Sequence, residues 1–199
     1  MKLNKAAMFG LDARIALAIF GALSVISGAA LYSAIQSAKV TALLSDMNEI
    51  GKAWEQYLLD TGSDLPAVSG NPNQRDMSYL VTDKSVNGWN GPYLSYPLFS
   101  NPVRLKYNNY GEFLFVAAQD VEWGGTAATS WPDHACSAND SKCMNWLLIH
   151  KIPSQDTVEA LDLMVDGVAD NSNGNLRWYY LADSNMHRVV LKIAPYQNP

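Results

Sequence analysis

The stretch IALAIFGALSVISGAALYSAI, residues 15–35, decides how the chain is organised, because it contains no charged side chain. An α-helix rises 1.5 Å per residue, so this stretch would be about 31 Å long, close to the roughly 30 Å hydrocarbon thickness of a bilayer. Lys2, Lys5 and Arg14 precede it, and positive residues favour the cytoplasmic side of a membrane. The pattern predicts a single-pass transmembrane helix, with its N-terminus in the cytoplasm and the rest of the chain outside.

The next segment, residues 36–62, is amphipathic rather than uniformly apolar. Its apolar residues step by three and four, which places them on one helical face. They are Val40, Leu43, Leu44, Met47, Ile50, Trp54, Tyr57 and Leu58. No proline interrupts residues 11–60, and Gly62 supplies a helix stop. The sequence therefore predicts one continuous helix of about 50 residues.

Two other interpretations of the apolar run compete with a retained helix. A secretory signal peptide would be cut after the small residues at 27–29, which would divide the continuous helix. A plain signal anchor would keep the run and then pass into a flexible linker. The amphipathic continuation favours a helix that is both anchor and structural part.

After Gly62 the chain becomes rich in turn residues, and short segments of β-branched and aromatic residues follow. The expected strands are residues 103–107, 112–118, 145–150, 175–181 and 188–194, and residues 154–167 are expected to form a short helix. These elements predict an α+β head, in which a small antiparallel sheet packs against the apolar stripe of the long helix.

The overall charge and the motifs exclude several classes of function. The formal net charge is −5 and the basic residues are scattered, which argues against nucleic-acid binding. The sequence has no Gly-x-Ser-x-Gly elbow, no phosphate-binding glycine-rich loop and no His-Glu-x-x-His motif. We therefore expect a protein that is not an enzyme.

The two cysteines, Cys136 and Cys143, flank a short polar loop. In an oxidising compartment this spacing favours a disulfide. Two free thiols, or a Cys136–His134 nucleophile pair in an anchored thiol hydrolase, are the alternatives. A zinc site is poorly supported, because zinc needs four ligands and only His134 is close.

A polar turn and an aromatic segment could each serve either the fold or the binding of a ligand. Asp166, Asp170, Asn171 and Asn173 offer oxygens of the kind that calcium accepts, but their spacing favours a tight turn without metal. The segment GWNGPYL, residues 88–94, is expected to form a corner whose Trp89 and Tyr93 pack against the helix, with ligand stacking as the minor alternative.

A basic leader ending at Gly10, an apolar helix, an amphipathic extension and an α+β head together resemble the type IV pilins and type II secretion pseudopilins. The segments YLLDTGSDLP (57–66) and GWNGPYL (88–94) resemble the junction between helix and head in major pseudopilins. The segment VDGVADNSNGNLRW (165–178) resembles an Asp-Gly turn before a late strand of such heads.

The resemblance implies that a prepilin peptidase cuts after Gly10 and methylates the new N-terminal Leu11. The family usually has an aromatic residue first after the cut and a glutamate fifth, whereas this chain has Leu11 and Ile15. The nearest acid is Asp12, with Arg14 close by, so these two are the candidate assembly residues. The implied divisions are a leader (1–10), a transmembrane and filament-core helix (11–35), its amphipathic continuation (36–62) and a globular head (63–199).

The resemblance also implies a function, partners and a location. The chain is expected to be a structural subunit of a type IV pilus-like or type II secretion pseudopilus filament. It would sit in the bacterial inner membrane before joining a periplasmic or extracellular filament. The implied partners are copies of itself through the N-terminal helix, other pilins or pseudopilins, inner-membrane assembly proteins and the prepilin peptidase. No cofactor is expected, apart from the minor calcium alternative. The competing hypothesis is a permanently membrane-anchored periplasmic module that binds a ligand or partner.

Overall fold

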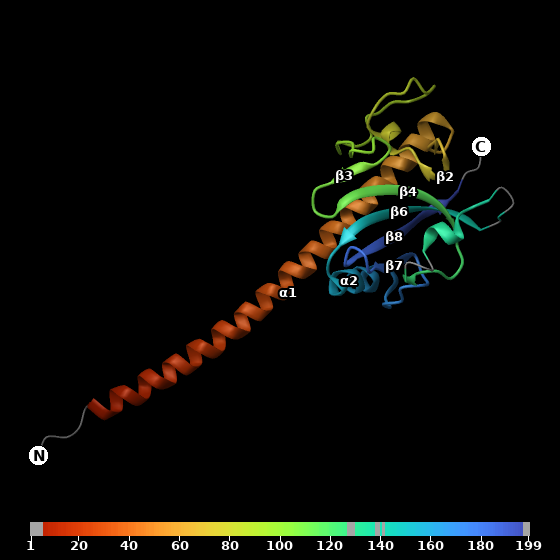
Figure 1. The fold of residues 1–199 in the computed structure, drawn as a ribbon. Helices are drawn as coiled ribbons and strands as arrows, with labels where there is room; N and C mark the ends of the chain where they lie inside the picture. Colours follow the sequence, from red (N-terminus) through yellow and green to blue (C-terminus); the bar gives the residue numbers. More distant parts are fainter. Residues whose placement is uncertain (1–5, 127–129, 138–139, 141, 197–199) are drawn as a thin grey trace, which may run out of the picture. The chain divides into compact units, whose positions relative to one another are not determined.

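The structure is a computed structural model that describes residues 6–126, 130–137, 140 and 142–196 (Figure 1). The chain divides into two compact units, residues 1–41 and residues 42–199. The unit boundary lies inside the first helix, so the helix from residue 42 onward belongs to the same compact unit as the sheet.

Helix α1 runs without interruption over Ala6–Thr61, which confirms the continuous helix that the sequence predicts. It ends where the sequence places a stop. Gly62 has a φ of +70°, a left-handed conformation that glycine adopts without a steric penalty, and its N–H donates to the carbonyl of Leu58 at 2.8 Å.

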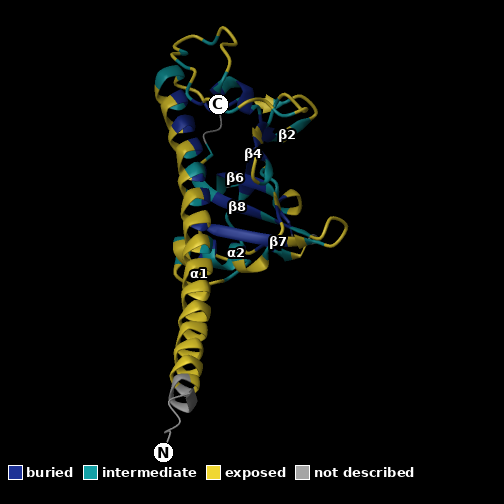
Figure 2. Cartoon of the chain, turned by 90° about the vertical axis from the view of Figure 1, so that its left-hand side faces the viewer, coloured by how far each residue is buried: buried dark blue, intermediate teal, exposed yellow. Residues whose placement is uncertain are grey.

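Most of the predicted apolar stripe of α1 is buried, and only Leu44 and Leu58 are partly exposed. Leu43, Met47, Ile50, Trp54 and Tyr57 are each at most 4% exposed. Figure 2 shows this change along the helix, from exposed residues in its first part to buried ones on one face of its last turns. The stripe packs on the sheet through apolar contacts, which are the main source of stability for such a helix.

In the described part of the head, eight strands and a second α-helix are present. The strands are β1 (Ala67–Val68), β2 (Asn71–Arg75), β3 (Leu105–Tyr107), β4 (Gly111–Gln119), β5 (Gly125–Thr126), β6 (Cys143–Ile152), β7 (Leu176–Leu181) and β8 (Met186–Pro195). They form one sheet in the order β1-β2-β4-β6-β8-β7-β5, and β3 also pairs with β4. The five expected strands correspond to β3, β4, β6, β7 and β8, while β1, β2 and β5 were not predicted.

The expectation of an antiparallel sheet is wrong at one edge, and the sheet is mixed. Strand β5 pairs with β7 in the parallel direction, whereas all other pairs are antiparallel. The chain reaches this edge through Gly124, where a Cβ atom would lie only 2.0 Å from the carbonyl oxygen of Asn171. Such a close approach of two backbones needs a glycine, and it holds the two residues of β5 beside β7.

Helix α2 spans Gln155–Asp166 and has the predicted ends. The Ser154 hydroxyl oxygen accepts a hydrogen bond from the N–H of Thr157 at 3.3 Å, as an N-cap does. Gly167 closes the helix with a φ of +76°, and its N–H donates to Leu163.

The two faces of the sheet carry different layers. Alternate residues of a strand point to opposite faces, so Phe115 of β4 faces α1, where its ring stacks on Trp54 at 6.0 Å. The neighbouring residues face a second apolar core, which includes aromatic side chains from the segment after β4. That core consists of Leu114, Val116, Ala118, Trp123, Trp131, Trp146, Leu148, Tyr179 and Val190.

Candidate functional site

The predicted processing and assembly residues all lie near the start of α1. Gly10, Leu11, Asp12 and Arg14 are helical, and Gly10, Asp12 and Arg14 are exposed. Asp12 and Arg14 are two residues apart, a spacing that does not bring side chains together on a helix. Each charge is therefore available to a group outside its own helix. The side chain of Leu11 lies outside the described residues.

The apolar stretch that follows is largely exposed. Leu17, Phe20 and Val25 are each more than 70% exposed. Among the described residues, α1 is the one helix long and apolar enough to cross a membrane. Exposed apolar surface of this extent is typical of a segment that is covered by lipid or by another protein.

Carboxylates of α1 are bound by tyrosine hydroxyl groups from the segment that follows η1, the short helix Met77–Leu80. The pairs are Asp46 with Tyr107 (2.6 Å), Glu49 with Tyr96 (3.4 Å) and Asp60 with Tyr93 (3.0 Å). Burial, followed by the negative charges of Asp46 and Glu49, raises the pKa of Tyr96 to about 12. Burial and the bond to Asp46 also raise the pKa of Tyr107. Both tyrosines therefore remain hydrogen-bond donors at neutral pH.

A buried aspartate ties the end of α1 to the middle of the sheet. Asp64 is 9% exposed and accepts hydrogen bonds from Trp54 Nε1, from its neighbour's N–H at Leu65 and from Asn145 Nδ2, each at 2.7 Å. These donors come from the helix, the turn and strand β6. A buried carboxylate is stable only with such a full set of partners.

The predicted corner at residues 88–94 is confirmed as a packing element. The Trp89 and Tyr93 rings contact each other at 5.7 Å, and Tyr93 also contacts the Tyr57 ring of α1 at 5.9 Å. Trp89 Nε1 donates to the carbonyl of Tyr79 at 2.8 Å. Gly88 allows the corner, because a Cβ at this position would lie 2.2 Å from the carbonyl oxygen of Asp60.

The oxygens proposed as minor calcium candidates hold a turn in the structure. Asp166 accepts from Asn175 N, Asn175 Nδ2 and Leu176 N at 2.8–2.9 Å. Asp170 accepts from Ser172 N and from Asn173 Nδ2, and the Asn171 side chain accepts from the Ser172 hydroxyl group. Within the described part of the chain, no group of three or more His, Cys, Asp or Glu is placed to hold a metal ion. These contacts match the tight-turn interpretation.

Asp162 of α2 is fully buried behind that turn. Its Oδ2 accepts from Asp170 N at 2.9 Å and from Trp178 Nε1 at 3.2 Å, whereas its Oδ1 has no hydrogen-bond partner among the described residues. Burial raises the pKa of Asp162 to about 6, against the effect of these two donors, and the negative charges of Asp166 and Asp170 add to the increase. No local sequence pattern marks this acid as buried, because its spacing fits an ordinary helix surface.

The predicted disulfide between Cys136 and Cys143 is present. It connects the segment after η3 (Trp131–His134) to the first residue of β6, and Cys136 N donates to the Ala117 carbonyl at 3.3 Å. The bridge therefore fixes the segment that supplies Trp131 to the second core. With both sulfur atoms bonded to each other, Cys136 has no thiolate, so the thiol-nucleophile alternative lacks its reactive group.

A cation and aromatic cluster lies on the second face of the sheet and was not predicted. Arg177 Nη2 and Lys192 Nζ bind the two oxygens of Asp120 at 2.8 and 2.9 Å. The Arg177 guanidinium lies over the rings of Trp123 and Trp146, at 4.9 and 4.7 Å. Burial lowers the pKa of Arg177, and Asp120 opposes that effect. Asp120 and Arg177 are 57 positions apart, so no local pattern marks the pair.

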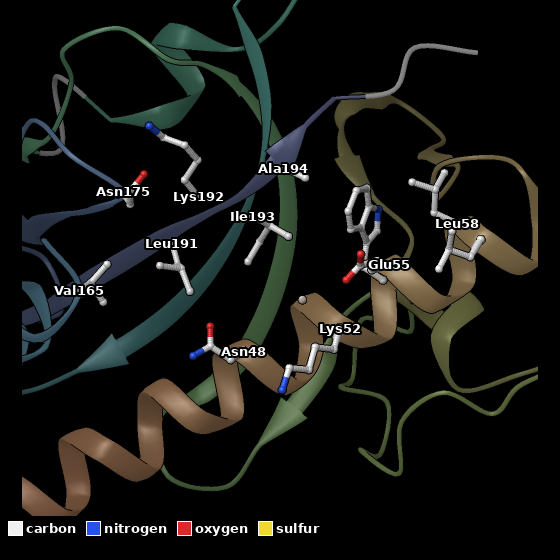
Figure 3. A pocket seen from close by; sticks show the side chains of 13 residues that line it. Asn48, Lys52, Glu55, Leu58, Val165, Asn175, Leu191, Lys192, Ile193 and Ala194 are labelled. Atoms are coloured by element: carbon white, nitrogen blue, oxygen red, sulfur yellow. The ribbon is translucent and has the colours of Figure 1, made fainter.

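A groove of about 640 Å³ lies between the last turns of α1 and strand β8. In Figure 3, Leu191 and Ile193 point toward α1, while Lys192 points to the opposite side of the strand. Polar residues of the helix, such as Asn48 and Lys52, stand at its edge. The lining residues are Asn48, Gly51, Lys52, Trp54, Glu55, Leu58, Leu59, Val165, Asn175, Leu191, Lys192, Ile193 and Ala194.

The described geometry thus offers an exposed apolar helix, an open groove and several buried polar contacts that hold the head together. None of these is by itself a set of catalytic groups. No family model, curated protein or solved structure matches this chain.

Proposed function

We propose that this chain is a structural subunit of a type IV pilus-like or type II secretion pseudopilus filament. It would be made as a membrane-anchored precursor and processed after Gly10. The observation that carries the proposal is the two-part character of α1. One part is apolar and exposed, and the other part is buried against the sheet of the head.

An exposed apolar helix requires a cover, because each Å² of apolar surface in water costs about 25 cal/mol. The bilayer supplies that cover before assembly, and the same part of other copies supplies it in a filament. The helix then serves in turn as anchor and as filament core, while the head forms the surface. This is the division of labour that the sequence resemblance implies.

Processing after Gly10 would leave Leu11 as the first residue, with Asp12 and Arg14 close behind it. Opposite charges on neighbouring copies can pair when each is exposed on its own helix. The proposed partners are other copies, related pilins or pseudopilins, inner-membrane assembly proteins and the prepilin peptidase. The proposed location is the bacterial inner membrane, followed by a periplasmic or extracellular filament.

Mass spectrometry of the protein from its native membrane tests the proposal. We expect a mature N-terminus at Leu11, and an N-terminus at Ala30 would replace the proposal with a secreted soluble domain. The variant Gly10→Leu is expected to stop processing, and Gly21→Leu is the matched control. A Cβ atom added at either glycine meets nothing within 4 Å, so neither position has a steric barrier to a side chain at its first carbon.

The groove beside α1 favours one second candidate, a permanently membrane-anchored periplasmic module that binds a ligand or partner. Its volume of about 640 Å³ is in the range of small-molecule sites. This candidate predicts a chain that keeps its leader, apart from removal of Met1, and that forms no filaments in cells. The N-terminal measurement separates it from the filament subunit.

A further inference from the structure

Four cationic residues lie in or beside three strands of the sheet: Arg104 just before β3, Lys106 in β3, Lys151 in β6 and Arg188 in β8. Lys106 is opposite Glu112 in the register of β3 and β4. Arg104 Nη1 lies 2.9 Å from Glu112 Oε1. The stem of Lys151 passes Gly111, where a Cβ would lie 3.3 Å from Lys151 Cδ. We call Arg104, Lys106, Lys151 and Arg188 the cationic rim.

His150 lies among these cations and reports on their combined field. Burial lowers the pKa of His150 to about 3, and the positive charges of Arg188, Arg104 and Lys151 lower it further. Its Nδ1 is 3.3 Å from Glu112 Oε1, and because the ring is neutral this contact is not an ion pair. Three members of the rim therefore act on one point, and His150 adds no charge near neutral pH.

The rim is only partly neutralised by its own chain. In the described residues, every ion pair involves either Glu112 or Asp120, and Glu112 pairs with Arg104. Lys106 and Lys151 are exposed, and Arg188 is half-buried. The rim is thus a positive surface on a chain whose formal net charge is −5, and it fits a partner that brings carboxylates.

The same head carries a surface of the opposite kind on α2 and the turn after it. Residues 152–176 contain five Asp or Glu and no Lys or Arg. Three large apolar side chains are exposed in that segment: Leu163 is 53% exposed, Met164 46% and Val168 64%. We define the α2 surface as Asp156, Glu159, Leu163, Met164, Asp166, Val168 and Asp170.

We propose that the cationic rim of one copy of this chain receives the α2 surface of a second copy. The inference rests on the proposed function, because it names the contact between heads in a filament. Two different surfaces of the same chain form a head-to-tail contact, and such contacts repeat into open helical assemblies when they do not close into a ring.

In the proposed contact, the charges select the partner and the apolar side chains supply most of the affinity. Exposed ion pairs contribute little affinity, about 0.2–1 kcal/mol each, but they select the partner and its orientation. The exposed Leu163, Met164 and Val168 supply apolar area that is lost from water on contact. Two chains that each carry a net negative charge repel each other. A contact that places the cationic rim against the acids of the α2 surface replaces this repulsion with attraction, so it is favoured over other contacts between the heads.

Isotope-mixed cross-linking of the full chain tests the contact. Unlabelled and ¹⁵N-labelled chains are produced together in the same membrane and treated with a carbodiimide, which joins a lysine amine to a nearby carboxylate. Mass spectrometry is expected to find light–heavy peptide pairs that link Lys106 or Lys151 to acids of the α2 surface. Light–heavy links from the rim only to other carboxylates, or none at all, would overturn the inference.

Charge reversal provides the second arm. The double variant Lys106→Glu, Lys151→Glu lacks the two amines that the carbodiimide joins, so its contact is measured with a photo-cross-linker added at a third rim position. The yield of light–heavy pairs from that position is expected to fall about tenfold relative to the unchanged chain. The matched control, Lys84→Glu with Lys142→Glu, makes the same change in net charge at two other exposed lysines and should leave the yield unchanged. An equal loss in both double variants would contradict a specific role of the rim.

Restoration completes the test. Adding Asp156→Lys and Glu159→Lys to the rim variant reverses both surfaces, so the yield should recover. Failure to recover, with folded chains confirmed by tryptophan fluorescence, would overturn the pairing. The proposed function is read separately from the N-terminus. If the chain is cut after Gly10 and forms filaments without the rim contact, only this inference is wrong. If the chain is uncut and forms no filaments, the proposed function itself is wrong.

Discussion

Replacing Asp162 with asparagine should change how the stability of the head depends on pH. The aspartate is fully buried, and its Oδ2 accepts hydrogen bonds from Asp170 N and Trp178 Nε1. Asparagine keeps a carbonyl oxygen for these donors. It cannot ionise, and its amide would stand where Oδ1 now lies without a partner.

The magnitude follows from the raised pKa of Asp162, about 6 in the folded chain. An unfolded aspartate titrates near 3.9, and a difference of about two units corresponds to about 3 kcal/mol. Because the folded pKa is the higher one, the folded state binds the proton more tightly. Its contribution is fully present below about pH 3.9 and is lost as the pH rises through about 6. Roughly 2 kcal/mol of that loss falls between pH 4 and pH 7.

Urea unfolding of the full chain in a mild detergent, followed by tryptophan fluorescence, measures the effect. Relative to the unchanged chain, Asp162→Asn should gain about 2 kcal/mol in free energy of unfolding on going from pH 4 to pH 7. Any constant cost of the new amide cancels in this comparison. Asp156→Asn, on the exposed side of the same helix, controls for the loss of one charge. A gain of equal size at both pH values would refute the reasoning.

Three further changes test other contacts, each by the free energy of unfolding. Asp64→Ala strands three buried donors and should cost about 3–5 kcal/mol, whereas Asp64→Asn keeps an acceptor and should cost less. Gly88→Ala should cost at least about 2 kcal/mol more than Gly70→Ala. Both glycines have a positive φ, but only a Cβ at Gly88 meets a backbone oxygen, so equal costs would contradict the close approach. Removing the bridge as Cys136→Ser, Cys143→Ser should cost about 2 kcal/mol and abolish sensitivity to reducing agents, and continued sensitivity would exclude the bridge as its source.

Much of the fold could be predicted because its signals are local. The stop at Gly62 and the expected range 154–167 match the ends of α1 and α2 within a residue or two. Strand β2 could not be found in this way, because its sequence NPNQR has no β-branched or aromatic residue. It is a strand because Gln74 and Arg75 pair with β4, a long-range contact that overrides a turn-like composition.

The candidate sites also differ in whether a local sequence signal predicts them. The disulfide joins two cysteines seven positions apart, so a short loop was enough to predict it. Asp64 follows a glycine and a serine, so its local sequence predicts an exposed aspartate in a turn. In the structure its side chain accepts a hydrogen bond from Asn145, 81 positions away. The members of the cationic rim likewise come from three strands and the residue before β3, and they are scattered in the sequence. Such groups become visible only when the register of the sheet is known.

The attachments between α1 and the head have a mechanical consequence. The helix is held near its first buried turn by Asp46 and Tyr107, midway by Trp54 and Phe115, and at its end by Asp60 and Tyr93. Tension applied along the helix axis loads these contacts in parallel, in shear, so that they must yield together. A pull across the axis would instead load these contacts one after another. The head is therefore built to resist pulling in the direction in which its helix runs.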